Sequence, residues 1–306
     1  MRFDFERTAF GRHETFALRF GWLTKGAQAL IGGEPVFEAE DATVRLGVGK
    51  NMVSSIRYWL QAARLIERSE MGWTLTDIGA YVFDDDGCDP YLEDEATIWL
   101  LHWLIASNPA LATSWWWFFN RFHKPEFTGG ELTTALQDFV KAQVQSRVSP
   151  STLKSDSEVL RRMYVRSAPS GNLQIEEALD SPLTVLGLIT ELPEAHGYES
   201  RPAAREDLPP TILGFAVVEL LRELGEMQLP VADLMYGPVG YPALGAVFRL
   251  TEGDLLAKLE RLVAGMPHKL ELRETAGVHQ LYVLDDLTPI DMLDAHYNGT
   301  HQRAAA

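Results

Sequence analysis

A short stretch that begins at Arg45, "RLGVGKNMVSSIRYW", could contact phosphate in two different ways. Its Gly-x-Gly-Lys could belong to a phosphate-binding loop, in which backbone N–H groups surround a nucleotide phosphate. That loop requires the spacing G-x-x-x-x-G-K-[ST]. Val44 stands where the first glycine should be, and Asn51 replaces the Ser or Thr that would hold magnesium. The spacing therefore argues against a nucleotide-driven enzyme.

The same stretch fits a helix-turn-helix better. "ATVRLG" predicts a short helix closed by Gly47, and "VGKN" predicts a tight turn. The helix that follows would place four residues on one apolar face: Val53, Ile56, Leu60 and Ala63. Two short strands and a closing helix are predicted next, so that region 35–90 reads as a winged helix-turn-helix.

The other face of this helix carries polar side chains suited to a DNA groove. Side chains at the start of such a helix meet base edges, while Lys and aromatic residues contact phosphate and sugar. The residues expected in the groove are Lys50, Asn51, Ser54, Ser55 and Tyr58. Arg57 is a departure, because such helices often keep a buried Leu there.

Phosphates are expected to be held from outside this helix by basic residues near the N-terminus. These residues are Arg12, Arg19, Lys25 and Arg68. His13 either adds to this positive surface or makes a structural hydrogen bond.

Other candidate sites have the wrong spacing for catalysis. His13-Glu14 begins like a zinc-protease helix, but Ala17 occupies the place of the second His in H-E-x-x-H. The run Trp115–Trp117 could stack on bases, but adjacent residues of a helix point in different directions, so a buried helix or a subunit interface is favoured. We therefore expect no enzymatic activity, no cofactor and no metal. An enzyme built from His13, Glu14 and distant residues is the weakest alternative.

Composition limits the kind of nucleic-acid contact. The 306 residues carry a net charge of −16, yet the first 70 contain ten Lys/Arg against nine Asp/Glu. A DNA-contacting surface should therefore lie near the N-terminus and be compact. The lone Cys88 favours a reducing compartment. The apolar run from Ile98 is too short for a membrane span, and we expect a cytoplasmic protein.

Punctuation by Gly and Pro predicts a mainly α-helical chain in four parts. An N-terminal segment (1–34) would pack on the winged helix-turn-helix (35–90), followed by a central helical domain (91–198). The last part (199–306) has helices followed by two strands, which is again the order of a winged helix, with a flexible tail. Its candidate helix is acidic, with Glu252 and Asp254 at its start, so dimerisation or docking is favoured there.

Several motifs together resemble an uncharacterised bacterial family, domain of unknown function 4007. They are "FGRHETFALRFGWLTKG", "LGVGKNMVSSIRYWLQAARLI", "DPYLEDEATIWLLHWLI", "ATSWWWFFN" and "SPSTLKSD", in this order. The resemblance implies no established activity. It implies a genomic setting, because members tend to be encoded beside phosphorothioate DNA-modification genes and phage-defence clusters. The family pattern singles out Arg12-His13-Glu14 and Lys50-Asn51.

The sequence therefore predicts a DNA-binding accessory or regulatory protein of a phosphorothioation-type DNA-modification or phage-defence system. Its candidate partners are double-stranded DNA, nearby-encoded modification or defence proteins, and a second copy of the chain. The alternative is an adaptor whose winged helices dock a DNA-modifying enzyme without contacting DNA.

Overall fold

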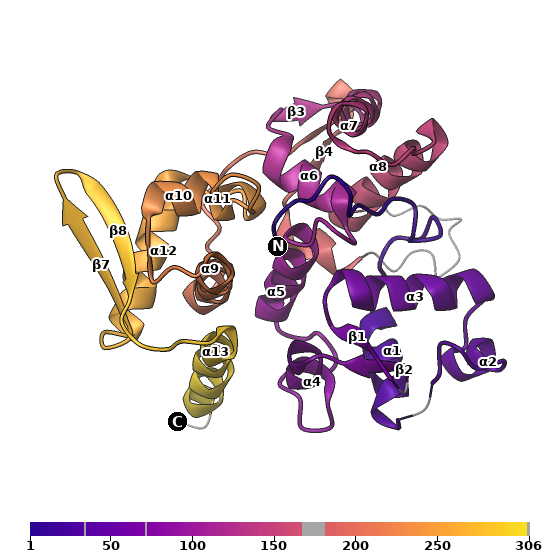
Figure 1. Ribbon diagram of the computed structural model, residues 1–306, viewed down its shortest axis with the longest axis horizontal. Helices are drawn as coiled ribbons and strands as arrows, with labels where there is room; N and C mark the ends of the chain where they lie inside the picture. The colour runs from indigo at the N-terminus through magenta and orange to yellow at the C-terminus, as the bar shows by residue number, and fades with distance from the viewer. Residues whose placement is uncertain (34, 71, 167–180, 305–306) are drawn as a thin grey trace. The chain divides into compact units, whose positions relative to one another are not determined.

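The computed structural model describes residues 1–33, 35–70, 72–166 and 181–304 (Figure 1). The chain divides into two compact units. The N-terminal unit comprises Asp4–Phe118 and Phe122–Ser200, and the C-terminal unit comprises Arg201–Ala306 with the short pieces Met1–Phe3 and Phe119–Arg121. The expected boundary at 198/199 lies beside this division. The expected boundaries at 34/35 and 90/91 fall inside the N-terminal unit.

The N-terminal unit begins with three helices, a hairpin and a fourth helix. Their bounds are α1 Trp22–Ile31, α2 Ala42–Leu46, α3 Lys50–Ala62, β1 Ile66–Ser69, β2 Gly72–Leu75 and α4 Asp77–Phe83. The strands pair antiparallel, with Ile66 opposite Leu75. Gly47 closes α2 with a φ of 60°, a left-handed conformation that favours glycine. The two predicted helices and the two strands that follow them are confirmed as elements.

Helices with buried aromatic residues make up the rest of this unit. Their bounds are α5 Glu95–Ala106, α6 Thr113–Arg121, α7 Gly129–Gln143, α8 Pro150–Tyr164 and the 3-10 helices η1 Pro182–Leu186 and η2 Pro193–Ala195. Three short strands form one sheet in the order β3-β5-β4: β3 Glu126–Phe127, β4 Thr190–Leu192 and β5 Gly197–Glu199. Trp115, Trp116 and Trp117 are all buried, which confirms the expectation that this helix belongs to the core.

The C-terminal unit alternates helices with the strands of one three-stranded sheet. Its elements are α9 Pro210–Leu224, β6 Gln228–Pro230, α10 Val231–Tyr236, α11 Leu244–Val247, α12 Glu252–Gly265, β7 Leu270–Thr275, β8 Val278–Val283 and α13 Pro289–Ala304. The sheet order is β6-β8-β7, so the first strand pairs with the last. Thr251 caps α12, because its hydroxyl accepts a hydrogen bond from the Asp254 N–H.

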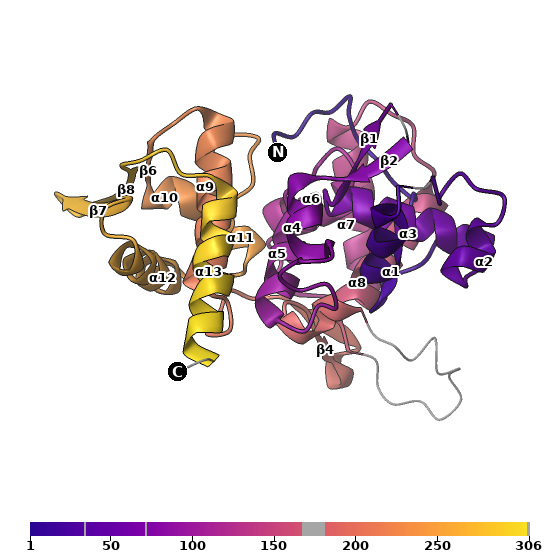
Figure 2. The ribbon, with the colours of Figure 1, turned by 90° about the horizontal axis from the view of Figure 1, so that it is seen from below.

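The flexible tail expected at the end of the last part was given no starting residue and stays a prediction. Residues from Pro289 form α13, which lies beside α9 (Figure 2). Met292, Leu293 and Tyr297 are buried. A side chain at Gly214 of α9 would meet Met292 Sδ at 2.9 Å, so the missing side chain permits this close approach. The helix is held by apolar burial, which a weak periodicity in the sequence does not reveal.

The described fold is mainly helical with small antiparallel sheets, as expected for the fold class. Within the described residues, no helix combines the length and the apolar character needed to cross a bilayer.

Candidate nucleic-acid interface

Helix α3 separates an apolar face from a polar one. Val53, Ile56, Leu60 and Ala63 are at most 7% exposed, as the periodicity predicted. They anchor the helix against α1 and α2. This packing fixes which side chains of α3 can reach a ligand.

The polar face carries a stripe of accessible residues at helical spacing. Lys50 and Asn51 are exposed, whereas Ser54, Arg57 and Gln61 are half-buried. The spacing of three and four residues places their side chains along one side of the helix. This set can contact a nucleic acid. It contains Arg57 and Gln61 in place of two predicted residues, Ser55 and Tyr58.

Ser55 and Tyr58 are corrections to the predicted site. Ser55 is fully buried, and its hydroxyl donates to the His13 carbonyl oxygen at 3.1 Å. Tyr58 is 6% exposed, and its phenol donates to the Leu111 carbonyl oxygen at 2.9 Å. Burial, followed by the nearby Asp156 charge, raises the pKa of Tyr58 well above 10. Both side chains hold α3 in the unit, and their burial leaves neither accessible to a ligand.

Arg57 is the accessible residue that the sequence reasoning set aside. Its guanidinium carbon lies 5.9 Å from the centroid of the Trp73 ring on β2. It thereby links α3 to the hairpin while remaining half-buried. The available signal was its spacing: Lys50, Ser54, Arg57 and Gln61 follow one another at intervals of three or four.

His13 is a third correction, because it is only 1% exposed and cannot add to a positive surface. Its Nε2 lies 2.9 Å from Asp156 Oδ1. The Thr15 N–H donates to Nδ1 at 3.1 Å, so Nδ1 is the acceptor and Nε2 carries the proton given to Asp156. The alternative expectation, a structural hydrogen bond, is the one that holds.

Asp156 joins three segments that are far apart in the sequence. Besides His13, its carboxylate accepts the Gly11 N–H at 2.8 Å and the Ser114 hydroxyl at 2.6 Å. In a serine–histidine–carboxylate triad the histidine lies between the other two groups, so that it can take the serine proton. Here the carboxylate lies between them, and all three side chains are buried. The arrangement therefore serves packing.

Aromatic rings surround this network. The His13 ring is stacked 6.2 Å from Trp59 and lies edge-on 5.8 Å from Trp115. The Trp59 Nε1–H donates to the Phe16 carbonyl oxygen at 3.2 Å. These contacts fix the segment before α1 against α3 and α6. They bring motif residues from three separate regions of the sequence into contact.

The four residues expected to hold phosphates differ in availability. Arg12 and Lys25 are exposed, and Arg19 is half-buried. Among the described residues, none of these three makes an ion pair. Arg68 is different, because its guanidinium donates to Glu38 at 2.8 Å and lies 5.2 Å from the Trp73 ring.

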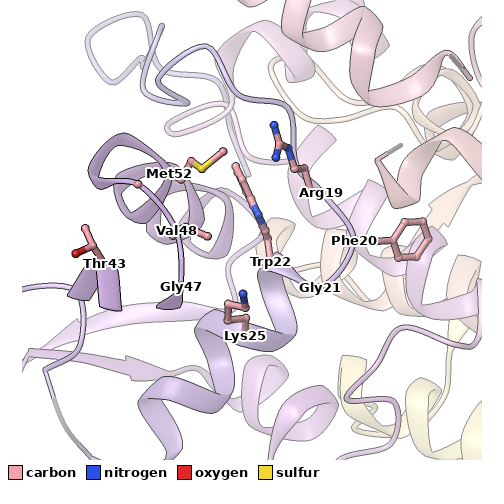
Figure 3. A pocket seen from close by; sticks show the side chains of 10 residues that line it. Arg19, Phe20, Gly21, Trp22, Lys25, Thr43, Gly47, Val48 and Met52 are labelled. Atoms are coloured by element: carbon pink, nitrogen blue, oxygen red, sulfur yellow. The ribbon is translucent and has the colours of Figure 1, made fainter. Parts of the chain in front are cut away.

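Arg19 and Lys25 line a cavity of about 620 Å³ next to the start of α3 (Figure 3). The turn between α2 and α3 forms its opposite wall. The lining residues are Arg19, Phe20, Gly21, Trp22, Lys25, Thr43, Gly47, Val48, Gly49 and Met52. Arg19 and Lys25, two residues predicted to hold phosphates, therefore lie near the start of α3, where Lys50 and Asn51 are exposed.

A metal site would need several ligands close together. Within residues 1–33, 35–70, 72–166 and 181–304, no three His, Cys, Asp or Glu side chains form a group that could hold a metal ion. The buried Asp156 carboxylate, for example, is hydrogen-bonded to Gly11, His13 and Ser114.

Comparison with known proteins gives a family and two similar structures. A family model described as "protein of unknown function (DUF4007)" matches residues 10–297. No curated protein matches. A crystal structure of SspB and a second one with a bound magnesium ion are each 31% identical to this chain, with a TM-score of 0.83. Each alignment covers 95% of this chain and 88% of the SspB chain.

The family match spans nearly the whole chain, which includes α3, the cavity and the Asp156 network. The similarity to SspB extends over both compact units. The chain belongs to the DUF4007 family of proteins of unknown function.

Proposed function

We propose that this chain is a DNA-binding accessory or regulatory component of a bacterial DNA-modification system of the phosphorothioation type, or of a phage-defence system. The proposal includes a winged helix-turn-helix built from α2, α3 and the β1–β2 hairpin. It gives α3 the role of reading the groove and gives the basic residues around its start the role of holding phosphates.

The observation that carries the proposal is a concentration of unpaired positive charge in an acidic chain. The basic residues on α3 or in the segments before it that make no ion pair with another described residue include Arg12, Arg19, Lys25, Lys50 and Arg57. Some basic side chains of the C-terminal unit are paired with carboxylates, as Arg222 is with Asp286 and Arg273 with Glu271. In a chain of net charge −16, free cations near one helix favour a polyanion as the ligand.

The polar stripe of α3 supports direct contact with bases. Asn and Arg can read adenine and guanine edges in the major groove by paired hydrogen bonds. Asn51 and Arg57 are positioned for this, with Ser54 between them. The hairpin is less suited to phosphate, since Glu67 and Glu70 are exposed beside the paired Arg68. These observations favour the start of α3 over the hairpin as the proposed contact with the duplex.

The family supplies the biological setting. The family resemblance implies a setting beside phosphorothioate-modification and phage-defence genes, and a solved protein, SspB, is similar over both units. One SspB structure holds magnesium. The proposal contains no step at a metal and no catalytic activity, and both absences stay predictions.

Fluorescence anisotropy across a salt series tests the proposal. The full chain is titrated against a random duplex, the upstream region of its own gene and a phosphorothioated duplex. Binding is expected to weaken with salt, with a slope of about 0.9 per phosphate contact. Preference for the upstream region indicates regulation, and preference for the modified duplex indicates recruitment to modified DNA. No binding at low salt overturns the proposal.

The absence of catalysis has its own test. Supercoiled plasmid incubated with the chain and magnesium is expected to remain supercoiled. Conversion to open circles by the wild-type chain, lost when Lys50 is changed to Gln, overturns the non-enzymatic part of the proposal.

A second candidate function, protein docking, is favoured by the surface of the C-terminal unit. A cavity of about 430 Å³ lies between α10, the start of α12 and the β7–β8 turn. Tyr236 and Val278 line it with exposed side chains, and Glu252 stands at its edge. Residues 201–306 contain nine Lys/Arg against fifteen Asp/Glu. Stoichiometric binding of a purified neighbouring gene product without DNA, weakened by Tyr236→Ser, supports this role.

A further inference from the structure

The cavity beside the α2–α3 turn is larger than a phosphate group needs. Its volume of about 620 Å³ is in the range of about 300–1,000 Å³ that is typical of small-molecule sites. A phosphate of a duplex backbone would occupy only part of it. The remaining volume and the lining residues indicate the chemical class of a larger ligand.

The lining of the cavity includes two cationic side chains. Arg19 and Lys25 line it, and neither makes an ion pair with another described residue. The Arg19 guanidinium carbon lies 5.3 Å from the Trp22 ring centroid and 5.8 Å from that of Phe16. These ring contacts hold the guanidinium in place without neutralising it, so it remains available to an anion.

The rest of the lining is apolar or weakly polar. Val48 and Met52 come from the turn and from α3, and Thr43 adds a hydroxyl. Figure 3 shows Met52 and Lys25 directed into the space between α1 and the turn, whereas the Phe20 ring points away from it. A methionine thioether makes favourable contacts with aromatic rings. The cavity thus offers a ring-binding surface beside a cationic one.

We propose that this cavity binds a nucleoside phosphate, with the phosphate between Arg19 and Lys25 and the base against Val48 and Met52. The nucleotide can come from two sources, a free nucleotide or a nucleotide extruded from a duplex. This inference rests on the proposed function only for the second source. It deepens that function, because the cavity adjoins the helix that reads the groove.

The position of the cavity couples it to DNA contact. Gly47, Val48 and Gly49 form its wall and lead directly into Lys50, the first residue of α3. Gly47 has a φ of 60°, and a Cβ there would lie 4.0 Å from Lys25 Nζ. A nucleotide in the cavity would occupy the phosphate-holding side chains, so a free nucleotide is expected to compete with duplex.

Isothermal titration calorimetry on the full chain tests the inference with dAMP, dTMP, deoxyadenosine and inorganic phosphate. The nucleotides are expected to bind more tightly than either the nucleoside or phosphate. Arg19→Gln with Lys25→Gln is expected to weaken nucleotide binding at least about tenfold. Met52→Ser is expected to weaken it about twofold to tenfold while leaving phosphate binding unchanged. Lys154→Gln, an exposed lysine on α8 outside the cavity, is the matched control.

A duplex that contains 2-aminopurine distinguishes the two sources. If free nucleotides do not bind, the inference still requires a rise in 2-aminopurine fluorescence on duplex binding, and Met52→Ser must remove that rise. If duplex binds without this rise and free nucleotides do not bind, the inference is overturned while the proposed function stands. If inorganic phosphate binds as tightly as dAMP and Met52→Ser has no effect, the cavity is only an anion site. If duplex and nucleotides both fail to bind, both proposals fall.

Discussion

Helices α3 and α12 occupy comparable places in their own units but begin in opposite ways. Each is the last helix before a two-stranded hairpin. Helix α12 starts with the Thr251 cap and with Glu252 and Asp254 in its first turn, all favourable near the positive end of a helix dipole. Helix α3 starts at Lys50 with no side-chain cap and no acidic residue in its first turn.

The start of α3 lacks the cap and the acidic residues that stabilise the start of α12. A lysine at the first position of a helix opposes the dipole and costs a few tenths of a kcal/mol. Departures of this kind tend to lie at functional sites. The start of α3 is therefore where a ligand is expected to supply the missing negative charge, whereas α12 already has its own.

The largest expected effect comes from removing what holds α3 in place. Asp156→Ala leaves three donors without an acceptor: the half-buried Gly11 N–H and the buried His13 Nε2–H and Ser114 hydroxyl. Each unpaired buried donor costs about 1–3 kcal/mol, so the N-terminal unit should lose roughly 3 kcal/mol or more. Urea unfolding monitored by Trp fluorescence measures this loss.

The counterpart in the C-terminal unit provides the control. Thr251→Ala removes only the α12 cap and should cost about 1 kcal/mol. Equal losses for the two variants would contradict the account of Asp156 as the group that joins three segments.

A smaller effect separates two neighbouring residues of α3. Arg57→Gln is expected to weaken duplex binding by about 1–3 kcal/mol, because an accessible guanidinium is lost, with little change in stability. Tyr58→Phe is expected to leave duplex affinity unchanged and to cost about 1 kcal/mol of stability, since the Leu111 carbonyl loses its donor. Anisotropy and thermal unfolding of both variants decide the assignment, and the reverse pattern would restore the sequence-based one.

These two residues also show how far sequence reasoning reaches. Periodicity located α3 and its apolar positions, including Ile56 and Leu60, because local patterning determines which face packs. It could not show that Ser55 and Tyr58 are covered as well. Their partners, the His13 and Leu111 carbonyls, are 42 and 53 residues away. A second buried face is created by distant segments and leaves no period of its own.

The C-terminal unit teaches the same lesson. The β7–β8 hairpin carries a local signal and was predicted. Strand β6 is three residues long and exists through its pairing with β8, so its sequence alone does not identify it. Helix α13 depends on burial against α9.

A still smaller effect tests the conflict between stability and binding at the start of α3. Lys50→Glu is expected to raise stability by about 0.3–1 kcal/mol, because the new carboxylate suits the helix dipole. The same variant should weaken duplex binding and its salt dependence. Thermal unfolding and anisotropy measure the two effects together. A loss of both stability and affinity would mean that Lys50 only supports the fold.

The smallest effect concerns the acidic start of α12. The Tyr236 phenol donates to Glu252, and this hydrogen bond, followed by the carboxylate charge, raises the pKa of Tyr236 above its usual 10.0. The neutral phenol is the form that is favoured, so the contribution to stability is fully present below pH 10 and is lost as pH rises through the raised pKa. Glu252→Gln should lower the pKa of Tyr236 toward 10, as measured by NMR titration. An unchanged pKa would show that the two groups are not coupled in solution.

The most direct test of the central claim compares the two helices at matched positions. Asn51 and Gly253 are each the second residue of their helix, and both are exposed. A photo-crosslinker is attached to Asn51→Cys or to Gly253→Cys in a chain whose single natural cysteine is removed by Cys88→Ser. The account predicts crosslinking to duplex DNA from position 51 and none from position 253. Crosslinking from position 253 alone would contradict it.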